Sequence, residues 1–267
     1  MLVCPLCNEP LINDEKSVKC INNHTFDRAK QGYLNLLPVQ HKNSREPGDN
    51  LEMVLARRHF LSEGHYAPLA ERLATLIQQQ HPTNWLDVGC GEGYYTQKIA
   101  ESLPHSQGFA LDISRDAIKQ ACKLTKNIHW LVASMARIPL ADQQSDLIAT
   151  IFSPFNWQEA MRVLNKQGGI LRLGPTNEHL MELREILYDE VRPYQDDKHL
   201  LQLPSELKLS FTDYLNFKLT LTKADDRKNL LAMTPHGWRA SAEKRQHVIE
   251  QDLSITISVR YDYFTFA

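Results

Sequence analysis

The chain has 267 residues, of which 42% are hydrophobic, so it can form one large domain or one domain with a smaller attachment. Its formal net charge of −2 excludes a uniformly basic nucleic-acid-binding protein, and any surface that binds nucleic acid must therefore be local. The sequence has no membrane-spanning apolar run and no secretory signal, and its five cysteines are typical of reduced thiols, so we expect a cytoplasmic protein.

Three of the five cysteines lie within the first 20 residues. Cys4 and Cys7 form a close pair, and Cys20 and His24 follow at a spacing that can complete a tetrahedral Cys3His site for zinc. A segment this short cannot bury enough apolar surface to fold unaided, so a bound metal would stabilise it. Four protein ligands leave no open position for water, which predicts a structural zinc. The alternative is a loop of reduced cysteines without a metal.

The next part of the chain changes from a mixed apolar segment over residues 26–37 to a polar, turn-rich stretch over 38–49. That composition is typical of a linker or a mobile loop. Apolar residues at helical spacing then predict helices over residues 50–62 and 66–80.

The most informative pattern begins where an apolar strand ends at Asp87. Glycines follow at alternate positions: Gly89, Gly91 and Gly93. A strand, a glycine turn and a helix in this order let the backbone approach a nucleotide-like ligand closely. The next predicted strand ends at Asp112, whose carboxylate can accept hydrogen bonds from both hydroxyls of a ribose. The pattern resembles the cofactor site of the class I methyltransferases, which use S-adenosylmethionine (SAM).

Two alternatives to this interpretation stay open. A dinucleotide-binding dehydrogenase would have a further glycine where this chain has Tyr94, and its pyrophosphate would disfavour a carboxylate such as Glu92 in the turn. The other alternative is a glycine-rich turn of an α/β protein that binds no ligand.

From residue 84 onward, predicted strands and helices alternate, which predicts βαβ units and a mostly parallel sheet with helices on both faces. The predicted strands are 85–88, 109–111, 129–132, 147–152 and 170–173. The predicted helices are 114–124, with Ser114 as N-cap, 157–164 and 178–191. Residues 218–222 and 254–266 alternate apolar and polar, as in the antiparallel pair that typically completes the sheet of a class I methyltransferase.

The ends of the third and fourth predicted strands bear on the substrate, because ligands of open α/β sheets lie at the carboxyl ends of the strands. At the end of the third strand, Ala133 and Ser134 replace the acid that many relatives place against adenine, so we expect backbone groups and packing to hold adenine there.

The end of the fourth strand, residues 150–156, lacks both the Asp/Asn-Pro-Pro motif of amine methylation and the Pro-Cys nucleophile of cytosine methylation. A ring nitrogen, an oxygen or a small-molecule acceptor remains. Phe155 or Trp157 is a candidate to stack on a flipped base, the alternative being ordinary packing of a helix on the sheet.

Several longer segments make the resemblance more specific. Together with Cys4-Pro-Leu-Cys7, Cys20 and His24, these are Gly32-Tyr-Leu-Asn-Leu-Leu-Pro-Val-Gln-His41, Pro47-Gly-Asp49, Ala56-Arg-Arg58, Gly64-His-Tyr66, Asp87-Val-Gly-Cys-Gly-Glu-Gly-Tyr-Tyr95 and His179-Leu-Met-Glu-Leu183. They resemble the RlmA/RrmA family of bacterial 23S rRNA (guanine-N1)-methyltransferases. The resemblance implies a zinc-binding domain that helps to recognise an rRNA hairpin, a class I SAM domain, and often a homodimer with an RNA cleft. It also implies that Tyr66, Gly91, Glu92 and His179 contact SAM.

We therefore expect three parts: a zinc-binding RNA-recognition domain over residues 1–37, a linker loop and helix over 38–65, and a SAM-dependent methyltransferase domain over 66–267. The predicted cofactors are SAM, with S-adenosylhomocysteine as product, and one structural zinc. The predicted SAM-binding residues are Tyr66, Asp87, Gly89, Gly91, Glu92, Gly93, Asp112, Ala133, Ser134 and His179.

The expected substrate is a guanine in a hairpin loop of 23S rRNA. The residues predicted to contact phosphate are Lys42, Arg45, Arg57 and Arg58, the alternative being a solvated helix face. A small-molecule methyltransferase is the alternative function, because the core motifs alone would fit one. The zinc knuckle favours RNA, since small-molecule enzymes of this class rarely carry one.

Overall fold

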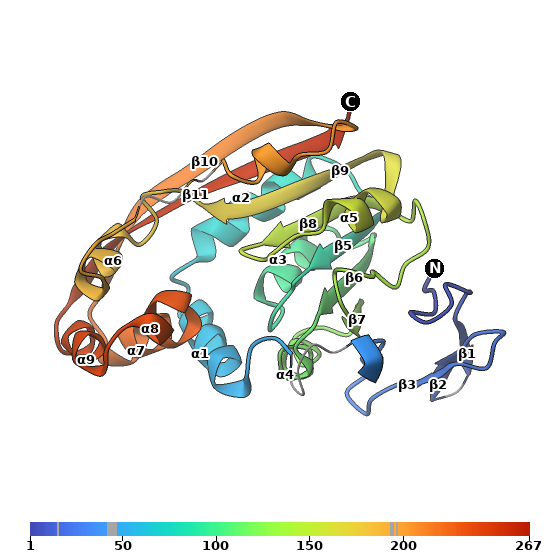
Figure 1. Ribbon diagram of the computed structural model, residues 1–267, viewed down its shortest axis with the longest axis horizontal. Helices are drawn as coiled ribbons and strands as arrows, with labels where there is room; N and C mark the ends of the chain where they lie inside the picture. The colour runs from blue at the N-terminus through green and yellow to red at the C-terminus, as the bar shows by residue number, and fades with distance from the viewer. Residues whose placement is uncertain (15, 42–46, 193–194, 196) are drawn as a thin grey trace.

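The computed structural model describes residues 1–14, 16–41, 47–192, 195 and 197–267. Its centre is a twisted sheet that has eight strands within these described ranges (Figure 1). In spatial order the strands are β10 (Leu207–Leu221), β11 (Leu253–Phe266), β9 (Leu164–Pro175), β8 (Ser145–Ile151), β5 (Asn84–Val88), β6 (Gln107–Asp112), β7 (Ile128–Val132) and β4 (Leu34–Asn35).

The strands from β4 to β9 pair in parallel, whereas β11 pairs antiparallel with both β9 and β10. The order β7-β6-β5-β8-β9 places β5 beside both β6 and β8, so the carboxyl ends of the parallel strands meet at one edge. This arrangement confirms the class I methyltransferase fold with an antiparallel C-terminal addition.

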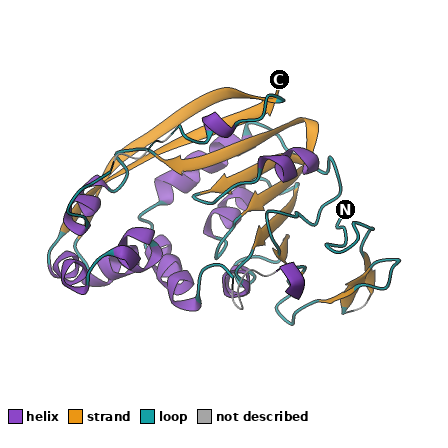
Figure 2. Cartoon of the chain, in the orientation of Figure 1, coloured by secondary structure: helices purple, strands orange, loops and turns teal. Residues whose placement is uncertain are grey.

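Helices cover both faces of the sheet (Figure 2). On one face, α2 (Ala67–Gln78), α3 (Tyr94–Ser102) and α4 (Arg115–Ala121) share a core with Trp85 and Leu147. On the other face, α5 (Trp157–Val163) shares a core with Leu86 and Ile148. Neighbouring residues of the central strands thus point into different cores, which is why these strands are largely apolar.

The N-terminal segment forms a small antiparallel sheet of β1 (Ile12–Asp14), β2 (Ser17–Lys19) and β3 (Thr25–Asp27). A 3-10 turn, Val39–His41, follows β4. Strand β4 joins the edge of the large sheet, where the Leu36 N–H donates to the Val132 carbonyl at 2.9 Å. A bridge between Leu2 and Leu140 attaches the start of the chain to the same side of the molecule. The N-terminal segment is therefore attached beside β7, at the edge of the large sheet.

A group of helices lies at the opposite end of the molecule in Figure 1. It contains α7 (Ala224–Met233), α8 (Pro235–Arg239) and α9 (Ala242–Glu250), which are inserted between β10 and β11, and it packs against α1 (Leu51–Ser62) and α6 (Met181–Leu187). The sequence analysis assigned no structure to residues 224–250.

The predicted elements differ from the structure mainly at their ends. The helix expected over 178–191 is limited to α6, because Leu180 before it is left-handed (φ 55°) and Tyr188 after it is extended (ψ 145°). The helix expected over 157–164 stops one residue earlier, because Leu164 already pairs in β9. The strand expected over 218–222 corresponds to the end of β10, which begins at Leu207 and ends at Leu221. Within the described ranges, every helix is too short or too polar to cross a membrane.

Candidate functional site

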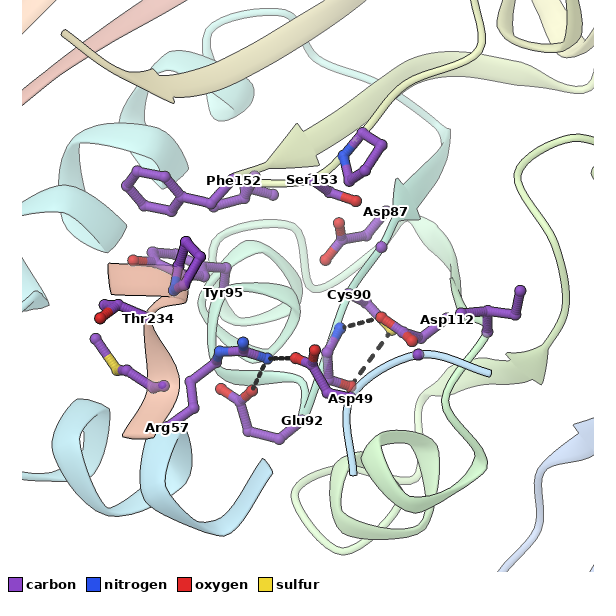
Figure 3. A pocket seen from close by; sticks show the side chains of 18 of the residues that line it. Asp49, Arg57, Asp87, Cys90, Glu92, Tyr95, Asp112, Phe152, Ser153 and Thr234 are labelled. Atoms are coloured by element: carbon purple, nitrogen blue, oxygen red, sulfur yellow. Dashed lines mark hydrogen bonds and ion pairs between the residues drawn. The ribbon is translucent and has the colours of Figure 1, made fainter. Parts of the chain in front are cut away.

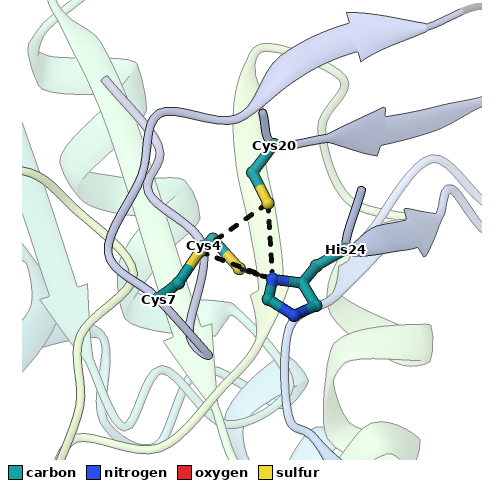
Figure 4. A group of neighbouring side chains, drawn as sticks. All are labelled: Cys4, Cys7, Cys20 and His24. Carbon is teal, nitrogen blue, oxygen red and sulfur yellow. Dashed lines mark hydrogen bonds between the residues drawn. The ribbon is translucent and has the colours of Figure 1, made fainter. Parts of the chain in front are cut away.

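The four predicted zinc ligands converge in the N-terminal segment (Figure 4). Nδ1 of His24 lies 3.5 Å from Sγ of Cys4 and 3.4 Å from Sγ of both Cys7 and Cys20. The Sγ atoms of Cys7 and Cys20 are 3.7 Å apart. A tetrahedral zinc with ordinary Zn–S and Zn–N bonds would separate its ligand sulfurs by about 3.8 Å and sulfur from nitrogen by about 3.5 Å. The donor set and its spacing therefore fit zinc.

Two short turns present these ligands. The Asn8 N–H donates to the Cys4 carbonyl at 2.9 Å, and the Asn23 N–H donates to the Cys20 carbonyl at 3.0 Å. Both asparagines are left-handed, with φ of 63° and 64°, a conformation that asparagine tolerates better than most residues. Each of the two turns is thus closed by its own asparagine, so residues next to the ligands fix the positions of the ligands.

A cavity of about 670 Å³ opens at the carboxyl ends of the parallel strands (Figure 3). This volume lies within the range of small-molecule sites. Its walls come from the turn after β5, the ends of β6, β7 and β8, the residues just before α6, and the junction of α7 and α8, together with Gly48, Asp49 and Arg57. All ten predicted SAM-binding residues except Gly93 line it. Gly93 instead packs beneath the turn, where a Cβ would come within 2.8 Å of the Trp130 ring.

The glycine turn is shaped by a close contact with the end of β8. Gly89 has a φ of 77°, and a Cβ added to it would lie 2.0 Å from Oγ of Ser153. Only glycine fits both the backbone conformation and that contact. The Gly91 N–H donates to Asp112 Oδ2 at 2.9 Å, so the turn and the end of β6 are also joined.

Buried carboxylates surround the glycine turn. Asp87 accepts a hydrogen bond of 2.6 Å from Thr96, while its Oδ1 has no partner among the described residues. Burial raises the pKa of Asp87 to about 7. Burial also raises the pKa of Glu92 to about 7, although the nearby Arg57 guanidinium opposes the shift. Burial likewise raises the pKa of Asp112. Such a group of acids favours a cationic ligand.

Arg57 lies inside the cavity, on the inner side of α1. Its Nη1 is 2.7 Å from Asp49 Oδ2 and 3.9 Å from Glu92 Oε2. Arg58, on the same helix, donates to Gln120 Oε1 on α4 at 3.1 Å. The structure therefore pairs Arg57 with cavity carboxylates, and its contact with RNA phosphate stays a prediction, as does that of Arg58. Lys42 and Arg45 lie outside the described residues.

Aromatic side chains gather at the end of the cavity away from Asp112. The Phe152 ring stacks on His179 with centroids 5.7 Å apart, and Tyr66 lies 6.5 and 6.3 Å from these two rings. Nδ1 of His179 accepts from the Ser258 N–H at 3.3 Å. Burial lowers the pKa of His179 to about 3, so the imidazole is neutral and its proton is on Nε2.

The α7–α8 junction, which the sequence analysis missed, closes this end. Met233, Thr234, Pro235 and His236 line the cavity. The Thr234 hydroxyl is buried and has no partner among the described residues. Nδ1 of His236 is 2.9 Å from the Tyr188 hydroxyl. These residues lie far along the chain from the glycine turn, and no motif in the sequence marks them.

Ala133 and Ser134 line the cavity just beyond β7, where the Ala133 N–H donates to the Asp112 carbonyl at 3.0 Å. Phe155 and Trp157, by contrast, are absent from its lining. They contact each other edge to face at 5.0 Å, and Trp157 contacts Phe264 at 5.1 Å. Both pack against the core under α5, so the aromatic ring that the end of β8 presents to the cavity is Phe152.

Two family models match the chain. Residues 2–45 match the model described as RlmA, N-terminal, and residues 86–173 match a methyltransferase domain. The first match contains all four zinc-ligand candidates, and the second contains the glycine turn and the ends of β5 to β8.

Relatives match over nearly the whole chain. A 23S rRNA (guanine(748)-N(1))-methyltransferase of Streptomyces fradiae is 31% identical over 271 residues, which cover 97% of this chain and 95% of the relative. A Bacillus subtilis protein described as "Putative 23S rRNA (guanine-N(1)-)-methyltransferase" is 32% identical over 276 residues, covering 98% of this chain and 95% of its own length. The solved structure of a "Putative Type II Methyltransferase" from Anaeromyxobacter dehalogenans has a TM-score of 0.52 and 17% identity, and it covers 72% of this chain and 94% of that one. It supports the fold alone.

Proposed function

The chain belongs to the RlmA family of SAM-dependent methyltransferases, and on this premise we propose that it methylates N1 of a guanine in a hairpin loop of 23S rRNA. The observation that carries the proposal is the presence of both parts in one chain. A Cys3His zinc site lies in a segment that matches the RlmA model, and the same chain forms a cofactor cavity at the carboxyl ends of a methyltransferase sheet.

SAM fits the charge and shape of the cavity. It carries a cationic amine and a cationic sulfonium, which the carboxylates of Asp87 and Glu92 would attract beside Gly89 and Gly91. Asp112 would accept hydrogen bonds from the ribose hydroxyls, because its oxygens each have one backbone donor and room for another. Ala133 and Ser134 would border adenine, and Tyr66 and His179 would border the methionine end, as the family resemblance implies. When bound, SAM supplies an electrophilic methyl group.

The protein's main contribution to the reaction would be orientation. N1 of guanine carries a proton at neutral pH, and this proton must pass to a base or to water as N1 attacks the methyl carbon. Holding the nitrogen, carbon and sulfur in line removes most of the entropic cost of the encounter. His179 is neutral, so it adds no positive charge to the cavity. The carboxylates therefore stay in excess and would favour cationic SAM over its neutral product.

The three predicted parts of the chain would have different roles. We propose that residues 1–37 recognise RNA, that 38–65 form a linker loop and helix, and that 66–267 perform the transfer. Strand β4 and the Leu2–Leu140 bridge attach the zinc segment beside β7, close to the end that would hold adenine. A homodimer in the cytoplasm, with RNA bound between zinc segments, is part of the proposal because the family resemblance implies it.

The alternative is transfer to a small molecule. A malonyl-[acyl-carrier protein] O-methyltransferase of Hahella chejuensis is 30% identical, but over only 49% of this chain. The RNA proposal is favoured because the rRNA-methylating relatives extend across the zinc segment as well.

The proposal is tested by methyl transfer from labelled SAM to 23S rRNA that lacks the modification, with 16S rRNA as the control substrate. We expect label in 23S rRNA alone, and N1-methylguanosine as the only labelled nucleoside after digestion. Label on another base, or equal label in 16S rRNA, would contradict it.

A further inference from the structure

We propose that Phe152 is the surface on which the flipped guanine stacks while its N1 is methylated. This inference rests on the proposed function, because it names the residue that holds the acceptor base. It differs from the sequence-based expectation, which placed the stacking ring at Phe155 or Trp157.

The backbone holds Phe152 in an unusual conformation. Strand β8 ends at Ile151, and Phe152 then has a φ of 50°, in the left-handed region that a bulky residue rarely adopts. Its N–H donates to the Leu173 carbonyl at 2.9 Å, which keeps it attached to β9. Strained backbone of this kind persists where the surrounding structure fixes it, and it occurs preferentially at functional sites.

The next residue ties this turn to the cofactor site. Ser153 packs directly on Gly89, with its Oγ at 2.0 Å from the position that a Cβ would take. The first glycine of the cofactor turn, Gly89, therefore contacts the turn that contains Phe152. The two sites share one contact, so a base on Phe152 would lie in the same cavity as the methionine end of SAM (Figure 3).

The ring itself has the surroundings of a stacking platform. Phe152 as a residue is 40% exposed although it lies at the centre of the carboxyl edge of the sheet, where the neighbouring Ile151 is buried. His179 stacks on it at 5.7 Å with an interplanar angle of 30°, so one side of the ring has a firm neighbour. A planar base needs such a supported aromatic surface, and base stacking of this kind changes affinity by roughly 10- to 100-fold.

A polar group lies at the same end of the cavity. The Thr234 hydroxyl is in a side chain that is 8% exposed, it lines the cavity, and it has no partner among the described residues. A buried hydroxyl without a partner is costly unless a ligand satisfies it. The polar edge of a base that stacks on Phe152 would supply the missing partner.

The test compares four variants in rRNA methylation and in SAM binding. Phe152→Leu keeps an apolar side chain but removes the plane, Phe152→Trp keeps a plane, and Phe155→Leu tests the ring packed in the core. Tyr214→Leu is the control, because Tyr214 is an exposed aromatic on β10 outside the cavity lining.

We expect Phe152→Leu to lower kcat/KM for 23S rRNA by about 10- to 100-fold while the Kd for SAM changes less than about twofold. Phe152→Trp should keep kcat/KM within about threefold of the parent, and Tyr214→Leu should leave it unchanged. The proposal is overturned if Phe152→Leu methylates rRNA normally, if it weakens SAM binding as much as it slows methylation, or if Phe155→Leu has the larger effect. If the parent protein itself methylates no 23S rRNA, the proposed function fails instead.

Discussion

The zinc site and the cofactor cavity are held in place by different physical means. At the zinc site, four side chains on two asparagine-closed turns converge, so a bound metal would stabilise these turns. At the cavity, carboxylates stand on the ends of buried parallel strands, and the packed core supplies the stability. We therefore expect that a change at one of the two sites leaves the other site intact.

Loss of zinc should give the largest effect and the sharpest separation. Replacement of one ligand, Cys20→Ser, leaves three donors and should abolish stable binding of the metal. We expect 23S rRNA methylation to fall by more than about 100-fold, because structural zinc supplies the folding free energy of such segments. The Kd for SAM should change less than about threefold. Isothermal calorimetry with SAM measures this, and an equal loss of SAM affinity would show that the two sites are not stabilised independently.

Gly89→Ala should damage the cavity side through packing. The new Cβ would meet Ser153, and we expect the free energy of unfolding to fall by about 2–3 kcal/mol, together with SAM affinity. Gly64→Ala is the matched control, because Gly64 has a similar φ of 82° but open space around its Cβ position. Chemical denaturation of both variants separates the strain of the backbone from the contact with Ser153. Equal losses in the two would show that the contact is unimportant.

Asp112→Asn should weaken SAM binding by about 10- to 30-fold, because a charged acceptor for the ribose becomes a neutral amide. Asp116→Asn on α4 is the control, since Asp116 pairs with Lys119 outside the cavity. Zinc content, measured by atomic absorption, should be unchanged in both variants. Loss of zinc from the Asp112 variant would mean that the two sites are not separable.

The smallest predicted effect is the pH dependence of stability and of SAM binding. Glu92 and Asp87 have folded-state pKa values of about 7, above their ordinary values, so the free protein binds more protons than the unfolded chain from roughly pH 4 to 7. The free energy of unfolding should therefore decline as pH rises through that window. Cationic SAM favours the ionised acids, so its binding should release protons near pH 7 and weaken as pH falls from 8 to 6.

Calorimetry in two buffers of different ionisation enthalpy measures the proton release directly. Glu92→Gln should release fewer protons and show a flatter pH dependence of the Kd for SAM. Uptake of protons on binding, or a Kd that falls as pH falls, would contradict the assignment of these carboxylates to the cofactor.

The same contrast explains what could be predicted from the sequence. The zinc ligands are close in the chain, so spacing alone identified them. The glycine turn and the strand that ends at Asp112 are each one short segment, so each could be identified from its own residues. The fold followed from the alternation of apolar strands and helices. These features depend on local chemistry, which a sequence displays directly.

The missed features depend on contacts between distant segments. Thr234 and His236 reach the cavity only because α7 packs on α1, and neither residue stands in a recognisable motif. Phe152 was within a segment identified as facing the acceptor, but a left-handed residue after β8 turns its ring, and not that of Phe155, toward the cavity. Arg57 had the spacing of a surface cation, whereas the nearby Asp49 and the distant Glu92 hold it inside the cavity.

The most direct test of the central claim is primer extension on 23S rRNA after incubation with the protein and SAM. A methyl group on N1 of guanine blocks Watson–Crick pairing, so reverse transcription must stop at the modified base. We predict one new stop, at a guanine in a hairpin loop, that requires SAM and disappears with the Cys20→Ser variant. Two results would contradict N1 methylation of a single hairpin guanine. One is full-length primer extension on rRNA that has incorporated the methyl label, and the other is a set of stops at many guanines.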